Sequence, residues 1–366
     1  MRRIIREYYK QKPLEEPSDL HKREIAIESL EDGVYIRHLA FPYMSALYDY
    51  ITNVKTPLHL YYSSAIYAVP DADRMENKVW EGSELLFDID ADKYEGCNQK
   101  LWVCPGTGDV YVAEPQVCPS EEKPVELPVL PWVCIARAWN NVLSLVNVLR
   151  EELGFNKVKV YFSGNRGFHV KTFDPEVLLL SREARKSVAD YISCEGLVLE
   201  KMFPAYRGKV VFGSLERGLR KRVLDVAIRR GRVEKGTKKL KNALLVDLEE
   251  VQSILKEEVC INIDRAVTMD ISRLSRFGNS LNMKAGLKVK ELPLNMNVEE
   301  LDFSDFSPFH GSIEVKSLVT GSVNVLGKKL DISRGNTYRV EAYVGVYLVV
   351  KGIALPKDTS DLEVKT

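Results

Sequence analysis

The chain has 366 residues, of which 45% are hydrophobic and 28% are charged; this describes a globular protein that is longer than one compact core usually holds. The 52 basic residues balance 52 acidic residues, so an attraction for polyanions has to come from a local patch. No apolar run is long enough to cross a membrane, and the charged start MRRIIREYYK is unlike a secretory signal peptide. We therefore expect a cytoplasmic protein without membrane association.

Residues 84–90 read ELLFDID and place two aspartates two positions apart on a predicted strand. Successive side chains on a strand point to opposite faces, so the apolar residues can enter a core while Asp88 and Asp90 share the other face. Two carboxylates at this spacing suit a pair of Mg²⁺ or Mn²⁺ ions. Acidic pairs of this kind are more often solvated than catalytic, so the interpretation depends on the rest of the chain.

Residues 91–131 change in character, because they combine cysteines with glycines and several prolines and predict an irregular insertion. Four of the six cysteines of the chain fall in or next to it, namely Cys97, Cys104, Cys118 and Cys134. They offer four thiolate ligands for a tetrahedral structural Zn²⁺, although the usual CxxC pair is missing. A metal-free loop or a disulfide remains open, since such an insertion needs a staple. We expect Cys194 and Cys260 to be small buried hydrophobes.

The clearest predicted helix spans 132–153, where apolar residues recur on one face and Gly154 supplies a stop. Residues 181–260 also predict helices. Within them, residues 217–241 carry eleven Lys or Arg against two acids, a net charge of 11 − 2 = +9. This stretch is compatible with binding of template phosphates, with a solvated helical surface or with docking of a subunit. From about Ser312, apolar and polar residues alternate and glycines recur at turn-like intervals, which predicts a meander of strands.

A predicted strand at 157–162 runs directly into the sequence SGNRGFH at 163–169. Its two glycines allow a tight turn that presents backbone N–H groups to an anion. Ser163, Arg166 and His169 add donors that match phosphate oxygens. The alternative is an ordinary hairpin in which Arg166 is solvated and His169 is buried in the core.

A third element begins with Val267-Thr268-Met269-Asp270, where an acid closes an apolar run. Arg273, Arg276 and Lys284 follow it. A third carboxylate for metal and cations for a departing pyrophosphate would complete a nucleotide site. Asp270 could equally be the N-cap of a short helix.

Taken together, ELLFDIDAD, YFSGNRGFHV and VTMDISRLSRFGNSLNMKAG resemble, in this order, the three signature motifs of the small, catalytic subunit of archaeal and eukaryotic DNA primases. The resemblance extends to VYIRHLAF and LYYSSAIY and covers roughly residues 30–290. It implies an α/β primase catalytic fold over residues 1–366, with a mixed β-sheet and an RRM-like part. It also implies a zinc-module insertion at 91–134 and a helical, partly basic insertion at 178–262.

The resemblance further implies that Asp88, Asp90 and Asp270 bind the catalytic Mg²⁺ or Mn²⁺. The residues that it places against a nucleoside triphosphate are Ser163, Gly164, Arg166, His169, Arg276, Asn282 and Lys284. The family often has a basic residue where this chain has Asn165, and usually a histidine where it has Asn282. Because an amide carries no charge, we expect weaker phosphate binding at Asn282 than a cationic histidine would give.

The activity implied by the resemblance is synthesis of short RNA primers from NTPs on a single-stranded DNA template, with the primase large subunit as partner. Two metal ions would activate the attacking 3′-hydroxyl and steady the departing pyrophosphate. A repair or end-joining enzyme of the same superfamily would share the motifs. A degenerate nucleic-acid-binding subunit is suggested only by Asn165 and Asn282, and the three aspartates argue against it.

Overall fold

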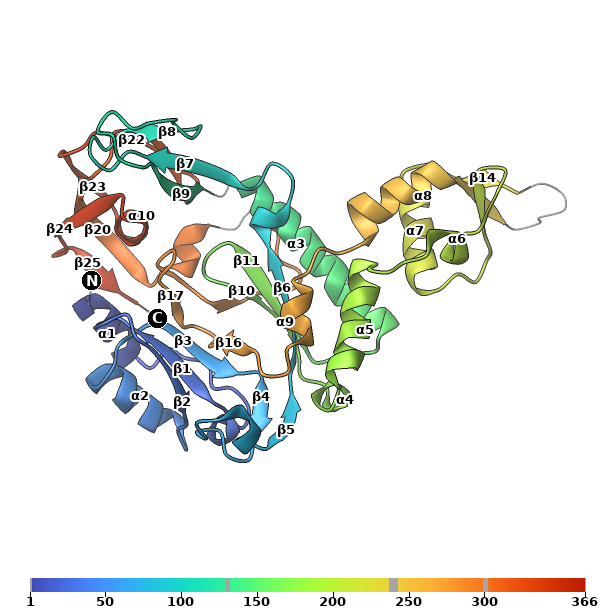
Figure 1. Cartoon of the computed structure of the whole chain (residues 1–366), viewed down its shortest axis with the longest axis horizontal. Helices are drawn as coiled ribbons and strands as arrows, with labels where there is room; N and C mark the ends of the chain where they lie inside the picture. The colour runs from blue at the N-terminus through green and yellow to red at the C-terminus, as the bar shows by residue number, and fades with distance from the viewer. Residues whose placement is uncertain (1, 130–131, 237–242, 299–301, 366) are drawn as a thin grey trace.

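The computed structural model describes residues 2–129, 132–236, 243–298 and 302–365, and two four-stranded sheets form its centre (Figure 1). The first sheet has the order β16-β3-β1-β2, with β1 Ile25–Ser29, β2 Tyr35–Leu39, β3 Pro57–Ser63 and β16 Leu274–Arg276. The second has the order β19-β10-β11-β6, with β6 Leu85–Asp90, β10 Val158–Phe162, β11 Gly167–Thr172 and β19 Lys290–Glu291. Described neighbours in both sheets pair antiparallel. The predicted mixed sheet is therefore wrong, because hairpin turns of the kind at 163–166 return the chain antiparallel.

The second sheet separates an apolar face from a polar one, as the alternation in β6 predicts. The apolar face packs against α3 Trp132–Asn147, with the rings of Trp139 and Phe168 5.4 Å apart. This helix continues as the π-helical turn η4 Val148–Glu152, and Gly154 follows with φ +76°, which confirms the predicted helix and its stop. The polar face carries the aspartates, which β6 and β11 hold in register.

Elements from the two ends of the chain pack around the two sheets. At the N-terminus, the elements are α1 Arg2–Lys10, α2 Met44–Asn53, β4 Ala65–Tyr67 and β5 Trp80–Ser83. At the C-terminus, they are β20 Phe309–Ser317, β21 Gly321–Val325, β22 Lys328–Ile332, β23 Thr337–Glu341, α10 Ala342–Val350, β24 Ala354–Asp358 and β25 Leu362–Val364. The two chain ends lie close together in Figure 1, and the Gln11 amide donates to the Val364 carbonyl at 2.9 Å. The predicted C-terminal strands are present, but the predicted meander is wrong, because β20 pairs with β23, β24 and β25, and among these strands only β21 and β22 pair in chain order.

The cysteine-bearing insertion forms a small sheet of its own, with β7 Gln99–Val103, β8 Val110–Tyr111 and β9 Val125–Val129. It packs on the C-terminal strands, where the Val110 N–H donates to the Thr320 carbonyl at 3.1 Å. Disulfides join Cys97 to Cys134 and Cys104 to Cys118. A sulfur bonded to sulfur offers no thiolate, so the prediction that Cys97, Cys104, Cys118 and Cys134 bind Zn²⁺ is wrong for this structure, and the disulfide alternative is the one observed.

Residues 199–236 and 243–259 form a lobe that projects away from the central sheets (Figure 1). Its helices are α6 Leu199–Met202, α7 Gly218–Arg229, α8 Leu248–Ile254 and the π-helical turn η5 Leu255–Val259. Its strands are β12 Ala205–Tyr206, β13 Lys209–Phe212, β14 Glu234–Lys235 and β15 Leu244–Asp247. The lobe has a hydrophobic core of its own, in which Phe203, Phe212 and Val251 are buried. The predicted helices are present, and a four-stranded sheet accompanies them, whose strands β13 and β15 contribute Val210, Phe212 and Val246 to this core.

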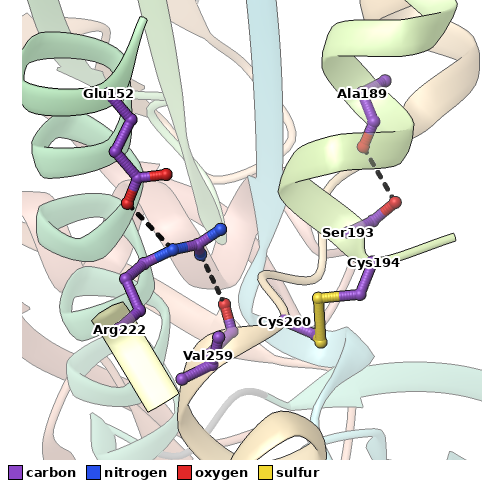
Figure 2. Close-up of a disulfide and its surroundings, with 7 residues drawn as sticks. All are labelled: Glu152, Ala189, Ser193, Cys194, Arg222, Val259 and Cys260. Carbon is purple, nitrogen blue, oxygen red and sulfur yellow. Dashed lines mark hydrogen bonds and ion pairs between the residues drawn. A yellow bond between two sulfur atoms is a disulfide. The ribbon is translucent and has the colours of Figure 1, made fainter. Parts of the chain in front are cut away.

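The lobe joins the body through α5 Arg182–Ser193 and the chain after η5. Ser181 caps α5, since its Oγ accepts the Ala184 N–H at 3.2 Å. Figure 2 shows the disulfide between Cys194 and Cys260, which links the segment that enters the lobe to the segment that leaves it. The prediction that these cysteines are buried hydrophobes is wrong, because they are only partly buried and are covalently paired.

The remaining α-helices and strands of the described chain are α4 Pro175–Leu178, α9 Arg265–Met269, β17 Leu281–Asn282 and β18 Leu287–Lys288. Short 3₁₀ helices are η1 Leu20–Lys22, η2 Met75–Asn77, η3 Ala91–Lys93 and η7 Phe303–Phe306. No helix within the described ranges is long and apolar enough to cross a membrane.

Candidate active site

A cavity of about 620 Å³ opens on the polar face of the second sheet, and strands of the first sheet also line it. Residues predicted from the sequence gather here from distant parts of the chain. Those that line the cavity are Asp88, Asp90, Ser163, Arg166, His169, Arg276, Asn282 and Lys284. The structure therefore brings the first two motifs together with the cations of the third.

The acidic end of the cavity is built by β6. Asp88 pairs with His169 on the neighbouring strand, and its carboxylate lies 3.7 Å from His169 Nε2. Burial, then repulsion by Asp90 and Asp264, raises the pKa of Asp88 to about 7. Burial also raises the pKa of Asp90, although Arg166 opposes the shift. Burial and the neighbouring acids thus disfavour the charged form of these carboxylates.

The third acid beside this pair is Asp264, which the sequence interpretation did not single out. The Asp264 N–H donates to the Asp88 carbonyl at 3.0 Å, which fixes the start of α9 against β6. Asp88, Asp90 and Asp264 line one common cavity of about 440 Å³. The Asp264 carboxylate caps α9 by accepting the Ala266 N–H at 3.0 Å.

Asp270 lies elsewhere, so the structure does not bring it together with Asp88 and Asp90 as the sequence predicted. It lines neither of the cavities that contain Asp88 and Asp90. Its carboxylate accepts the Ser272 N–H at 2.9 Å and the Ser272 hydroxyl at 2.7 Å. Burial lowers the pKa of Arg185 to about 10, and the negative charge of Asp270 opposes this shift. The residue is not an N-cap either, because it ends α9.

The donor chemistry of the acidic end fits divalent cations. Carboxylates are the ligands that Mg²⁺ and Mn²⁺ prefer, and a cation would relieve the repulsion that raises the pKa of Asp88. Among the described residues, no three His, Cys, Asp or Glu side chains are arranged to hold an ion by themselves. This is compatible with Mg²⁺, which commonly takes one or two carboxylates and completes its shell with water and substrate phosphates.

The predicted phosphate turn closes on itself between β10 and β11. The Ser163 N–H donates to the Gly167 carbonyl at 2.8 Å, and the Gly167 N–H donates to Ser163 Oγ at 3.1 Å. Gly164 has φ +75°, and a Cβ there would lie 2.8 Å from Asn282 Cβ. Gly164 therefore shapes the turn, whereas Ser163 lines the cavity.

Arg166 and His169 carry different charge at this turn. Arg166 forms an ion pair with Asp92 at 2.8 Å and approaches Asp90 at 4.0 Å. Burial, then the nearby cations Lys171 and Arg276, lowers the pKa of His169 to about 3, so its imidazole is neutral. Its Nδ1 is buried with no hydrogen-bond partner in the structure. His169 therefore offers a neutral hydrogen-bonding group to a ligand.

The opposite wall comes from the first sheet. Arg276 is buried, its Nη1 lies 3.0 Å from His59 Nδ1, and its guanidinium stacks 4.8 Å from the centre of the Tyr61 ring. Asn282 donates to the Ser163 carbonyl at 2.9 Å and accepts the Lys284 N–H at 3.2 Å. Asn282 thus ties the phosphate turn to the third motif.

The basic stretch at 217–241 is largely neutralised where the structure describes it. Arg230 pairs with Glu250 at 2.9 Å and with Glu257 at 2.7 Å, and Arg229 pairs with Glu258. Arg222 pairs with Glu152 at 3.0 Å, as Figure 2 shows, and further pairs hold Arg220 and Lys221. Residues 237–242 lie outside the described ranges. These pairs favour a role within the lobe over contact with template phosphates.

Buried carboxylates at one end of a cavity and cations at the other are typical of enzymes that bind a nucleoside triphosphate with divalent cations. Comparison with known proteins defines the family within this class. The family profile described as DNA primase small subunit matches residues 133–292.

Three archaeal relatives match nearly the whole chain. The protein named DNA primase small subunit PriS of Staphylothermus marinus is 45% identical over 358 residues, covering 96% of this chain and 93% of the relative. Proteins of the same name from Saccharolobus solfataricus and Aeropyrum pernix are each 34% identical and cover 96% of this chain, with 93% and 91% of their own lengths matched. The chain belongs to the DNA primase small subunit family.

Among solved structures, the polymerase domain of Mycobacterium tuberculosis ligase D in complex with DNA superposes with a TM-score of 0.37 at 10% identity, covering 81% of this chain and 82% of that one. The family assignment depends on the sequence relatives and not on this superposition.

Proposed function

We propose that this protein is the catalytic subunit of a DNA primase, a nucleotidyltransferase that makes short RNA primers from NTPs on a single-stranded DNA template. The observation that carries the proposal is the placement of Asp88, Asp90 and Asp264 around one cavity that adjoins the cationic wall of Arg276 and Lys284. Family membership supports the same function. The repair and end-joining alternative is less well supported, because the relatives named as primase subunits match nearly the full length.

In this proposal Asp88 and Asp90, with Asp264 in place of Asp270, would hold Mg²⁺ or Mn²⁺, each ion taking one or two of these carboxylates and completing its shell with water and substrate phosphates. Bound metal would supply activation of the 3′-hydroxyl and stabilisation of the departing pyrophosphate. Ser163 and the neutral His169 donate hydrogen bonds to phosphate oxygens, and Arg276 and Lys284 supply positive charge. Arg166 would exchange its pairing with Asp92 for a phosphate when the nucleotide binds.

The proposal also includes a primase large subunit as partner and treats 91–134 and 178–262 as insertions into one catalytic domain over residues 1–366. The RRM-like description of the second sheet belongs to the same proposal.

The decisive experiment compares Asp264→Asn with Asp270→Asn, two identical changes six residues apart. Asparagine is also a good N-cap, so Asp264→Asn keeps the cap of α9 while it removes the charge. We expect Asp264→Asn to lose more than about 100-fold in primer synthesis, because changes in outer-shell partners of a metal already cost about 10–100-fold. Asp270→Asn should stay near wild type.

Primer synthesis is measured on single-stranded DNA with NTPs and Mg²⁺ or Mn²⁺, together with chemical denaturation as a control for folding. Wild-type activity of Asp264→Asn, or loss only in Asp270→Asn, would overturn the assignment of the third carboxylate. Initiation without a supplied primer separates a primase from an end-joining enzyme, so a wild-type protein that only extends primers would contradict the proposed function.

A further inference from the structure

A further part of the cavity wall comes from the C-terminal part of the chain. Tyr347 and Val350 of α10, with Lys351 directly after it, line the same cavity as Asp88 and Arg166. All three lie beyond residues 133–292, which the family profile matches. None belongs to the three motifs, so the sequence did not mark them.

Lys351 is held in this wall without a negative partner. No carboxylate forms an ion pair with it among the described residues. Its Nζ lies 5.2 Å from the centre of the Tyr347 ring, a cation–π contact with an uncharged group. Burial, then repulsion by Arg166 and Lys284, lowers the pKa of Lys351 to about 8. The side chain is therefore still mostly protonated at neutral pH, and its charge is not balanced.

Other cations that line this cavity also lack a carboxylate partner in the described chain. Within the described chain, Arg273, Lys284 and Lys351 all line the cavity and none pairs with a carboxylate. Arg166 alone among the lining cations has acidic partners. A folded protein rarely collects like charges in a partly buried wall unless a ligand of opposite charge binds there.

Lys351 also has a simpler structural role to be separated from this one. Its N–H donates to the Tyr347 carbonyl at 3.0 Å at the end of α10, where a cation interacts favourably with the helix dipole. That role needs charge near the helix end but does not need the side chain to line a cavity together with Lys284 and Arg166. It predicts an effect on folding stability and none on ligand binding.

We propose that Lys351 binds a phosphate group in this cavity, so that the C-terminal part of the chain contributes a substrate contact to the site. This inference rests on the proposed function for the identity of the substrate. The phosphate belongs either to the incoming nucleoside triphosphate or to the backbone of the bound nucleic-acid strand, and both present the same oxygens to an ammonium group.

The test replaces Lys351 by methionine, which keeps the apolar length and removes the charge, and by arginine, which keeps the charge. Lys357→Met, at an exposed lysine of β24, is the matched control for the loss of one positive charge. Two binding arms are measured separately: ATP with Mn²⁺ and no DNA, and single-stranded DNA with no nucleotide over a range of salt.

If the nucleotide is the source, Lys351→Met weakens ATP binding by about 10-fold or more, the scale of a lost charge-assisted hydrogen bond. If the strand is the source, DNA affinity falls and the salt slope decreases by about 1. Lys351→Arg recovers most of the loss in either case, and Lys357→Met changes neither. Unchanged binding in both arms, or a loss that follows the denaturation midpoint in both Lys351 variants, would overturn the proposal.

These outcomes are independent of those for the proposed function. A wild-type protein that binds ATP through Lys351 but makes no primers would contradict the function and leave the phosphate contact standing. A protein that makes primers at the wild-type rate and KM after Lys351→Met would contradict the contact alone.

Discussion

Replacing Asp88 with asparagine is expected to stabilise the folded protein, and to do so increasingly as the pH rises. The pKa of Asp88 increases from 3.8 to about 7 on folding. Between these values the unfolded chain releases the proton while the folded protein keeps it, so stability falls as the pH rises and levels off above pH 7. Asparagine carries no proton to lose and avoids this cost.

The magnitude follows from the two pKa values. A tenfold change in proton affinity corresponds to about 1.4 kcal/mol, so the free energy of unfolding of Asp88→Asn should exceed that of the wild type by up to about 4 kcal/mol near pH 8. Near pH 4 the difference from ionisation should vanish. Because Asp90 and Asp264 share the repulsion, the measured gain should fall below this upper value.

The assay is denaturation by guanidinium chloride at several pH values between about 4 and 8, in EDTA, for both proteins. Asp92→Asn is the matched control, because Asp92 forms an ion pair with Arg166 at 2.8 Å and its loss should give no gain. Saturating Mn²⁺ should stabilise the wild type more than Asp88→Asn. A difference between Asp88→Asn and the wild type that does not change with pH would refute the reasoning.

Three further outcomes are expected. Cys194→Ser with Cys260→Ser should lower the free energy of unfolding by about 4 kcal/mol, because the lost disulfide closes a loop over a sequence separation of 66; an unchanged denaturation midpoint would contradict it. Gly164→Ala should lower folding stability and ATP affinity more than Gly154→Ala does, since both glycines have φ near +75° but only Gly164 has close neighbours. We expect chemical denaturation to show a loss of about 1–3 kcal/mol in the free energy of unfolding for Gly164→Ala. Equal losses in the two variants would argue against the contact with Asn282. Arg229→Gln with Arg230→Gln should destabilise the lobe and leave the salt slope of DNA binding unchanged, because their charges are already paired; a smaller slope would point to template contact.

Local patterns predicted the parts of the site that one element can build. Alternation in β6 was enough to place Asp88 and Asp90 on the polar face. The glycines of SGNRGFH predicted a tight turn, and the structure has it between β10 and β11. In both cases the information lies within a few residues of sequence.

The proposed third carboxylate, Asp264, could not be chosen in the same way, because Asp264 and Asp270 flank the same short helix α9. Which end of α9 faces β6 is decided by the hydrogen bond from the Asp264 N–H to the Asp88 carbonyl, a contact between residues far apart in sequence. A usable signal was present, since Asp264 stands directly before the helix as a good N-cap. The pairing of the cysteines could not be predicted for the same reason, because it depends on which segments fold against each other.

The contribution of the C-terminal part of the chain is hidden from sequence for a different physical reason. Helix α10 reads AYVGVYLVV and is buried around most of its surface, so its pattern marks core on all sides and no functional face. The first charged residue after such a helix has to emerge where the core ends. Packing of α10 against β20 and β24 decides that this edge becomes part of the wall of the cavity that Asp88 and Arg166 also line. The position of Lys351 is thus a consequence of how the core closes, and only a structure reveals that an apolar helix delivers a cation to the site.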